Sequence, residues 1–442
     1  RCFSLNDVVR FLFYVYLYRD IRMAIFSCCF AREMVMFCRM FLSMFFYSLM
    51  MILHIRVFLV TAVTAVVFLA CASKGDVLLG NVSNPTLQKM SHDFRYVGRY
   101  DGFCYGVYNA GYCSTEEHPK HLDIDLRIVK WLPEDAGVKY SFQVAKAGDG
   151  RTDFYRPPYD PTGFIEGEKL YCMYCPSVDS TATYVCRVFN MKSETFEGEE
   201  SVMTLDGQPM TVWNVLNIYN EKSPVKCSWI LDGSPEKAFG LGLNVKIVKY
   251  GDAYYSCLSE VGGTFCGMII RSYNLTDWET VAIPNLTSLP RGQSFWEGSV
   301  FPLKTGLFAY TARLQNEDGV VFGLWNPATG QISHLQLVPD AIVSRPELFE
   351  LRGEVYLACN IHGPSDVEGY GSVYRATCAF FRINPDEGSL ERVRTKTVAE
   401  GIHYFTFYSW RRNLYMVYST DSRRLNAREA RSNIALERIV LR

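Results

Sequence analysis

Four acidic residues stand out, because paired carboxylates can act as a general acid and as a base or nucleophile. Glu297 follows Trp296, and Glu347 follows Arg345-Pro346; both stand where a predicted β-strand begins. Asp101 precedes a glycine and Asp160 precedes a proline. Solvated loop acids are the alternative for the two glutamates, and turn formation is the alternative for the two aspartates.

Two other clusters have the residue types of a metal site. Cys172 and Cys175 have zinc-ligand spacing, but no second such pair follows at a suitable interval. His118 and His121 form a second cluster, which we interpret as part of a surface loop. We therefore expect neither a metal nor a cofactor.

The acids must be positioned by β-strands, because the second half of the chain repeats one strand unit. A strand leads through a turn into an aromatic-rich second strand, and two more strands follow in most copies. The spacing is ~45–55 residues, near the blade period of β-propellers. The four copies comprise these predicted strands: 245–250, 253–259, 265–272 and 279–283; 299–303, 307–313, 320–325 and 332–337; 346–351, 354–360, 376–383 and 390–395; 404–409, 414–419 and 435–441.

The first half is less regular. We predict strands at 94–107, 124–131, 138–144, 169–175, 183–190 and 210–219. These strands could supply two further blades of the same propeller. Alternatively, they form a separate β-domain over 90–235, with a domain boundary near 232–242. We expect the C-terminal strand to pair with N-terminal strands, which removes exposed edges.

The sequence therefore predicts an all-β fold, a β-propeller over 90–442 with about six four-stranded blades, five being the alternative count. The clear repeats span 240–442. A β-sandwich with similar hairpins is the competing architecture. The propeller is favoured because the four copies agree in order as well as in composition.

The N-terminal seventy residues have a different pattern. His54 and Arg56 supply a short basic region, residues 57–70 are uninterruptedly apolar, and Ala70-Cys71-Ala72 is a small-x-small cleavage site. This is the layout of a secretory signal peptide, predicted over 50–72. Residues 1–49 are then an upstream extension or leader. A membrane anchor and a lipoprotein signal at Cys71 are the alternatives.

Cysteine usage agrees with secretion, because ten of the fifteen cysteines follow Cys71. Several stand close together, as hairpin-local disulfides would, and we predict bridges for the pairs Cys104/Cys113, Cys257/Cys266 and Cys359/Cys378 and within the group Cys172, Cys175, Cys186 and Cys227. Sequons at Asn81, Asn274 and Asn285 predict a glycoprotein.

Length and charge limit the function further. The chain has 442 residues and a formal net charge of −1, with 49% hydrophobic residues. That composition supports an extensive packed core. Because Lys and Arg are scattered rather than clustered, a nucleic-acid partner is not expected.

The segment 271–279, with the sequence R-S-Y-N-L-T-D-W-E, carries a family resemblance. It resembles the S-x-D-L-x-x-W turn between outer blade strands of arabinanase-like and invertase-like propeller glycosidases, and a shortened sialidase Asp-box. Asn274 replaces the usual aspartate. In such turns an Asx side chain bonds backbone amides and the tryptophan packs beneath the hairpin.

The resemblance implies catalytic carboxylates on the innermost strands, around a central channel. Glu297, Glu347, Asp101 and Asp160 are then the candidate catalytic residues. Arg345 could clamp a substrate carboxylate, as sialidase arginines do, and Trp296 is a second candidate for substrate binding. A full sialidase pattern also needs a Tyr–Glu pair and three arginines from separate blades, and the sequence alone does not single these out.

We predict a secreted or extracellular propeller that acts on or binds glycans, as a glycoside hydrolase with carboxylates at the channel mouth. The alternative is a non-catalytic propeller that binds glycans or proteins at the cell surface. The expected partner is a glycan or glycoprotein. We expect a monomer that does not associate with membranes once the signal is cleaved.

Overall fold

The computed structural model describes residues 76–79, 87–114, 121–145, 159–176, 183–225, 240–243, 246–261, 267–289, 295–314, 319–342, 344–362, 375–398, 401–421 and 432–441. The chain divides into two compact units, Arg1–Ser73 and Lys74–Arg442, and the fold below is that of the second. The predicted signal peptide and upstream extension lie outside the described residues. Among the helices in the ranges above, none is long and apolar enough to cross a membrane.

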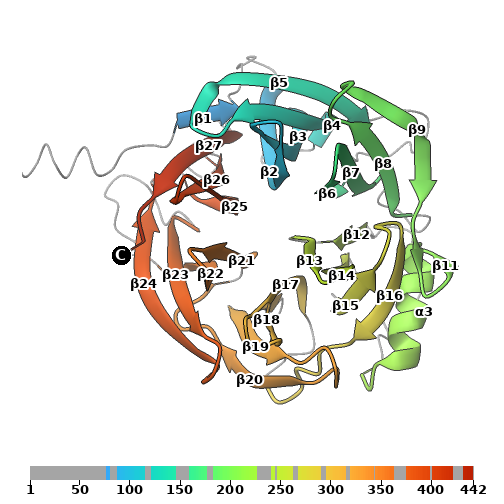
Figure 1. Ribbon diagram of the computed structural model, residues 1–442, viewed down its shortest axis with the longest axis vertical. Helices are drawn as coiled ribbons and strands as arrows, with labels where there is room; N and C mark the ends of the chain where they lie inside the picture. The colour runs from blue at the N-terminus through green and yellow to red at the C-terminus, as the bar shows by residue number, and fades with distance from the viewer. Residues whose placement is uncertain are drawn as a thin grey trace, which may run out of the picture. The chain divides into compact units, whose positions relative to one another are not determined.

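Two antiparallel four-stranded sheets form the N-terminal part of this unit (Figure 1). Sheet 1 contains, in order, β2 (Leu87–Tyr100), β3 (Phe103–Ser114), β4 (His121–Leu132) and β5 (Asp135–Ala145). Sheet 2 contains β6 (Tyr159–Glu166), β7 (Lys169–Cys175), β8 (Val185–Asn190) and β9 (Thr195–Val202). Each sheet is a meander, because consecutive strands pair with one another.

Sheet 3 is larger. Its central strand β14 (Ala253–Val261) pairs on one edge with both β12 (Gly240–Leu243) and β13 (Val248–Tyr250). On the other side follow β15 (Gly267–Ser272), β16 (Asp277–Ala282) and the short strands β10 (Thr204–Leu205) and β11 (Gln208–Pro209). The helix α3 (Val212–Lys222) follows β11 in the chain.

Three four-stranded sheets complete the unit. Sheet 4 contains β17 (Phe295–Pro302), β18 (Phe308–Leu314), β19 (Val320–Trp325) and β20 (Ile332–Leu337). Sheet 5 contains β21 (Glu347–Leu351), β22 (Glu354–Ile361), β23 (Thr377–Asn384) and β24 (Ser389–Thr397). Sheet 6 contains β25 (His403–Trp410), β26 (Asn413–Asp421), β27 (Ser432–Ile439) and β1 (Asp76–Leu79).

The six sheets of the described residues follow one another in a closed cycle. Separate hydrophobic clusters join sheets 1 and 2, 2 and 3, 3 and 4, 4 and 5, 5 and 6, and 6 and 1. Inner strands of neighbouring sheets also contact one another, in the pairs β2–β6, β6–β12, β13–β17, β17–β21, β21–β25 and β25–β2. These strands lie innermost around a common centre in Figure 1.

Burial follows from this stacking. Strand β19 is buried at every position, whereas the outermost strand β20 of the same sheet is half-buried or exposed throughout. A middle strand packs against neighbouring sheets on both faces, so bulky apolar residues are needed there. Tyr255, Phe308 and Trp325 show this between sheets 3 and 4, with ring centroids 5.0–5.9 Å apart. Each such aromatic pair adds about 1 kcal/mol beyond its buried area.

The N-terminal strand β1 completes sheet 6. It pairs antiparallel with the C-terminal strand β27, which is the pairing expected for the C-terminal strand. The two ends of the unit thereby share a sheet, and the outer edge of β27 is covered.

Strands of the second half agree with the predicted ranges closely, but two predictions in the first half are wrong. Residues 94–107 are not one strand, because Asp101-Gly102 turns the chain between β2 and β3. Residues 210–219 are mostly helix α3, capped by Thr211, whose side chain accepts a hydrogen bond from the Asn214 amide at 3.2 Å. Its buried residues repeat at helical spacing, in Val212, Val215, Leu216, Ile218 and Tyr219.

The predicted disulfide between Cys359 and Cys378 is not formed, since both thiols are free. The register places Cys359 opposite Ala379 and Cys378 opposite Asn360. Adjacent strand residues point to opposite faces, so one thiol lies in the core between sheets 4 and 5 and the other between sheets 5 and 6. The structure also has free buried thiols at Cys104, Cys172, Cys186 and Cys257.

Candidate functional site

Four innermost strands carry the same irregularity, near the N-terminal end in β6, β17 and β25 and in the middle of the longer strand β2. In β2, β6, β17 and β25, two residues oppose one residue of the second strand, which is a β-bulge. The bulged pairs are Asp93-Phe94, Asp160-Pro161, Glu297-Gly298 and Tyr404-Phe405. By register, these pairs occupy equivalent positions in sheets 1, 2, 4 and 6.

Two of the bulges hold a non-glycine residue in the left-handed backbone region. Glu297 has a φ of 47° and Tyr404 a φ of 46°. This conformation costs an L-residue roughly 1–2 kcal/mol, and such strain persists where the surrounding structure imposes it, often at functional sites. The equivalent placement of Glu297 and Tyr404 marks this end of the inner strands as the candidate site.

Glu297 is buried and forms an ion pair within its own sheet. Arg313 of β18 donates from Nη1 to Glu297 Oε2 at 2.9 Å. The Arg313 guanidinium carbon also lies 4.4 Å from the ring centroid of Trp296, in cation–π geometry. The predicted site residues Trp296 and Glu297 therefore meet at a shared arginine.

Tyr404 lies beside two buried arginines, Arg95 of β2 and Arg345, which precedes β21. The guanidinium carbon of Arg345 is 4.9 Å from the Tyr404 ring centroid, and that of Arg95 is 5.9 Å away. Arg345 is 2% exposed and Arg95 is 1% exposed. Two guanidinium groups beside one phenol, with little water around them, form a strong positive field suited to an anion.

Backbone oxygens hold both guanidinium groups in place. Arg345 donates from Nη2 to the Phe405 carbonyl at 3.3 Å, and Arg95 donates from Nη1 to the Phe94 carbonyl at 3.3 Å. Both carbonyls belong to bulged residues. The bulges thus serve as acceptors that orient the arginines, as well as positioning Glu297 and Tyr404.

Glu347 is fully buried at the first position of β21. Its Oε1 accepts hydrogen bonds from Thr406 Oγ1 at 2.9 Å and from the Phe407 amide at 3.2 Å. Burial raises the pKa of Glu347 to about 7, against the opposing effects of Lys246, the two hydrogen bonds and Arg95. The solvated-loop interpretation of this residue is therefore wrong.

The two aspartates lie at different ends of their strands. Asp101 is an exposed turn residue with a φ of 46°, at the end of β2 opposite its bulge. Asp160 lies within β6 at the bulge, equivalent by register to Glu297. The structure brings Trp296 and Glu297 together, places Arg345 beside Tyr404, and keeps Asp101 at the far end of its strand.

Three residues of this arrangement were missed in the sequence, namely Arg95, Arg313 and Tyr404. Arg313 stands inside a strand predicted as core, and Tyr404 is one of 28 tyrosines. One usable signal exists: an apolar strand carries few charges, so a lone arginine in a predicted middle or inner strand indicates a buried partner.

The segment that carried the family resemblance forms the turn between β15 and β16, the outer strands of sheet 3. Ser272 Oγ accepts from the Leu275 amide at 2.9 Å, and Asn274 Oδ1 accepts from the Asp277 amide at 2.8 Å. Trp278 is buried beneath the turn and donates from Nε1 to the Leu275 carbonyl at 3.1 Å. The turn has the structural role that the resemblance implies.

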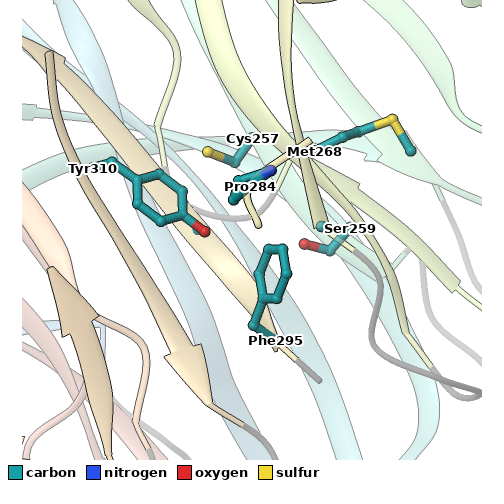
Figure 2. A pocket seen from close by; sticks show the side chains of 8 residues that line it. Cys257, Ser259, Met268, Pro284, Phe295 and Tyr310 are labelled. Carbon is teal, nitrogen blue, oxygen red and sulfur yellow. The ribbon is translucent and has the colours of Figure 1, made fainter. Parts of the chain in front are cut away.

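A narrow gap lies in the core beside the Glu297 bulge, between sheets 3 and 4 (Figure 2). The hydroxyls of Ser259 and Tyr310 point into it near Phe295, and neither has a hydrogen-bond partner among the described residues. The gap has no room for a water molecule. It is a packing feature behind β17, not a substrate pocket.

Comparisons with known proteins identify the fold. No family model matches the sequence, and no curated protein matches it. Among solved structures, the chain is similar to Trypanosoma rangeli sialidase in complex with 2,3-difluorosialic acid (covalent intermediate), at 12% identity and a TM-score of 0.52, over 78% of this chain and 53% of that one. The fold is a sialidase-like β-propeller.

Two further structures support the propeller. An intramolecular trans-sialidase from Ruminococcus gnavus, in complex with oseltamivir carboxylate, matches at 11% identity and a TM-score of 0.50, over 79% of this chain and 94% of that one. A protein of unknown function from Dyadobacter fermentans matches at 10% identity and a TM-score of 0.54, over 84% and 98%. The chain spans little more than half the length of the Trypanosoma enzyme. The all-β propeller prediction is confirmed.

Proposed function

We propose that this propeller is a glycoside hydrolase for glycans that end in a carboxylate-bearing sugar of the sialic acid type. The carrying observation is Tyr404, which lies beside Arg345 and Arg95 at a bulge equivalent to that of Glu297. We take each of the six sheets as one blade. Arg95, Arg313 and Arg345 then come from blade 1, blade 4 and the entry to blade 5.

In this proposal Tyr404 and Glu297 act as the Tyr–Glu pair of a sialidase-type site, and Arg95, Arg313 and Arg345 act as its three arginines. Arginines bind a carboxylate through parallel charge-assisted hydrogen bonds, and sialidases use a tyrosine nucleophile. In the proposed reaction, Tyr404 Oη attacks the anomeric carbon and Glu297 accepts the phenol proton. The glycosidic oxygen leaves with a proton, and water then releases the sugar from the tyrosine.

Asp160 is the proposed acid for the leaving group, on the grounds of its register position in β6. Trp296 is proposed to contact the substrate beside Arg313. We leave Asp101 out of the proposed site, because it turns the opposite end of β2. Glu347 is also left out of direct catalysis, because it is fully buried and hydrogen-bonded to β25.

Hydrolysis of fluorogenic sialosides tests the proposal. We expect the wild-type protein to release the fluorophore and Tyr404→Phe to lose at least about 100-fold in kcat, because the nucleophile is removed. Tyr250→Phe is the matched control, since Tyr250 is an exposed residue of β13. A wild-type protein that neither hydrolyses nor binds any sialoside rejects the proposal.

A non-catalytic glycan-binding propeller is the second candidate. Two observations favour this function. The Glu297 carboxylate is engaged in an ion pair with Arg313, and the Glu347 carboxylate is fully buried, so neither is free to act on a substrate. The same variants separate the two functions. Saturable binding of a sialoside without turnover, reduced by Arg345→Gln but not by Tyr404→Phe, would favour binding.

We further propose a secreted protein, exported through the signal peptide at 50–72 and acting as a monomer on glycans or glycoproteins. The exposed sequon at Asn285 supports glycosylation during export. Expression of residues 50–442 in a secreting eukaryotic cell tests this. The medium should contain a monomeric chain that begins near Ser73.

A further inference from the structure

Glu347 makes contacts that the proposed reaction does not use. Together with Arg345, two residues earlier in the chain, it contacts three consecutive residues of β25. Arg345 donates to the Phe405 carbonyl, and Glu347 accepts from Thr406 Oγ1 and from the Phe407 amide. Because β21 belongs to sheet 5 and β25 to sheet 6, these bonds join two blades.

The three bonded residues begin inside the bulge that carries Tyr404. An innermost strand has a free edge, and its outward backbone groups need partners that no further strand supplies. The Phe405 carbonyl and the Phe407 amide find theirs in Arg345 and Glu347. The backbone on the C-terminal side of Tyr404 is thereby fixed against the neighbouring blade.

We propose that Glu347 is a positioning residue: with Arg345 it forms a clamp on Phe405–Phe407 that holds the bulge of β25 and so places Tyr404 against the arginines. The catalytic consequence of the clamp depends on the proposed function. The clamp itself does not, because it concerns the order of β25 in the free protein.

The surroundings of the carboxylate make the clamp sensitive to pH. Lys246 and Arg95 interact favourably with the charged form of Glu347, and the buried Cys378 thiol lies near enough for its pKa to be raised by that charge. Arg345 is the cation on its own segment. Burial raises the pKa of Glu347 to about 7, so the carboxylate ionises near neutral pH. Opening that exposes the carboxylate returns its pKa toward the ordinary value of 4.5, so the clamp opens more readily as pH rises through neutrality.

Amide hydrogen exchange of residues 403–410 tests the clamp in the free protein. Thr406→Val removes one donor without changing the side-chain volume greatly, and we expect exchange there to rise about ten-fold. Thr406→Ser keeps the hydroxyl and should stay within about two-fold of wild type. Glu347→Gln keeps an acceptor oxygen but cannot ionise, so the extra exchange of wild type above pH 7 should disappear.

Thr311→Val is the matched control. Thr311 is also buried and donates to the Val321 carbonyl at 2.7 Å, but inside sheet 4. This variant should leave residues 403–410 unchanged. The clamp is rejected if Thr406→Val leaves exchange at 403–410 unaltered, or raises it equally in sheet 2, which would mean a general loss of stability.

Sialoside hydrolysis by the same variants separates the two proposals. With both correct, Thr406→Val lowers kcat while Thr406→Ser and Thr311→Val do not. If the wild-type protein is inactive and binds no sialoside, the proposed function fails, and hydrogen exchange still decides the clamp. If Thr406→Val loosens β25 without changing kcat, the clamp exists but does not position Tyr404, which overturns the inference.

Discussion

The inner strands β17 and β21 place a buried glutamate at the same end of adjacent sheets, yet the two carboxylates have different partners. Strand β17 is bulged, and Glu297 pairs with Arg313 of its own sheet. Strand β21 pairs with its neighbour without a register shift, and Glu347 bonds to Thr406 and Phe407 of the next sheet.

The difference lies in the backbone. A bulge inserts one residue and re-aims the side chain it carries, so Glu297 reaches an arginine beside the candidate site. A regular strand keeps its alternation, and Glu347 stays at the boundary between two sheets. One inserted residue therefore separates a carboxylate that takes part in the proposed chemistry from one that positions the machinery.

The largest effect on the free energy of unfolding is expected from Arg313→Met. The variant leaves the Glu297 carboxylate buried without its cation, which typically costs about 3–5 kcal/mol of unfolding free energy. Chemical denaturation measures it. The double variant Arg313→Met/Glu297→Gln should recover much of the loss, because no unpaired charge remains. Equal stability of the single and double variants would mean that the ion pair contributes little.

Glu347→Gln should change the pH dependence of stability. The folded pKa of about 7 lies above the ordinary value of 4.5, so the folded state holds a proton that the unfolded state has released. The contribution of Glu347 to stability is therefore full below about pH 4.5 and falls as pH rises to about 7. Across that window the wild type should lose up to ~3 kcal/mol relative to the variant. Parallel stability profiles from pH 5 to pH 8 would contradict this.

A smaller effect on stability is expected from enlarging Gly298, where the β17 bulge packs closely against sheet 3. A Cβ at Gly298 would lie 3.0 Å from Cys257 Cβ and 3.1 Å from its Sγ. Gly298→Ala should cost about 1–3 kcal/mol through overpacking. Gly319→Ala is the control, since a Cβ there meets nothing within 4 Å, and thermal unfolding should show almost no shift for it.

The smallest effect on stability and turnover is expected from a substitution at Asp101, in the hairpin turn that ends β2. Asp101→Asn keeps a residue that tolerates the left-handed turn, so unfolding free energy should change by less than about 0.5 kcal/mol. Sialoside turnover should also be unchanged. A marked loss of turnover would return Asp101 to the site and weaken the assignment of the site to the bulge end.

Much of the fold was predictable because strand periodicity and turn residues are local signals. The second-half strands and the turn at 272–278 follow from them. The hairpin at Asp101-Gly102 was missed although Asp-Gly is a strong turn signal. Helix α3 was not predicted, because the apolar periodicity of a segment of only 11 residues does not by itself distinguish a buried helix from a strand.

The site was harder to predict, since it depends on contacts between distant residues. Glu297 and Arg345 were predicted from their place at the start of inner strands. Arg95 and Tyr404 meet only because sheets 6 and 1 close the cycle, and no local pattern marks that contact. The separate environments of Glu297 and Glu347 depend on a bulge, which the sequence shows only as a glycine after Glu297.

Covalent trapping tests the central claim most directly. The protein is incubated with 2,3-difluorosialic acid, and the modified residue is located by peptide mass spectrometry. We predict a mass increase of one fluorosialyl group on Tyr404, absent from Tyr404→Phe and much reduced in Arg345→Gln. A wild-type protein that remains unmodified while it hydrolyses sialosides, or an adduct on another residue, would contradict the assignment of Tyr404 as the nucleophile.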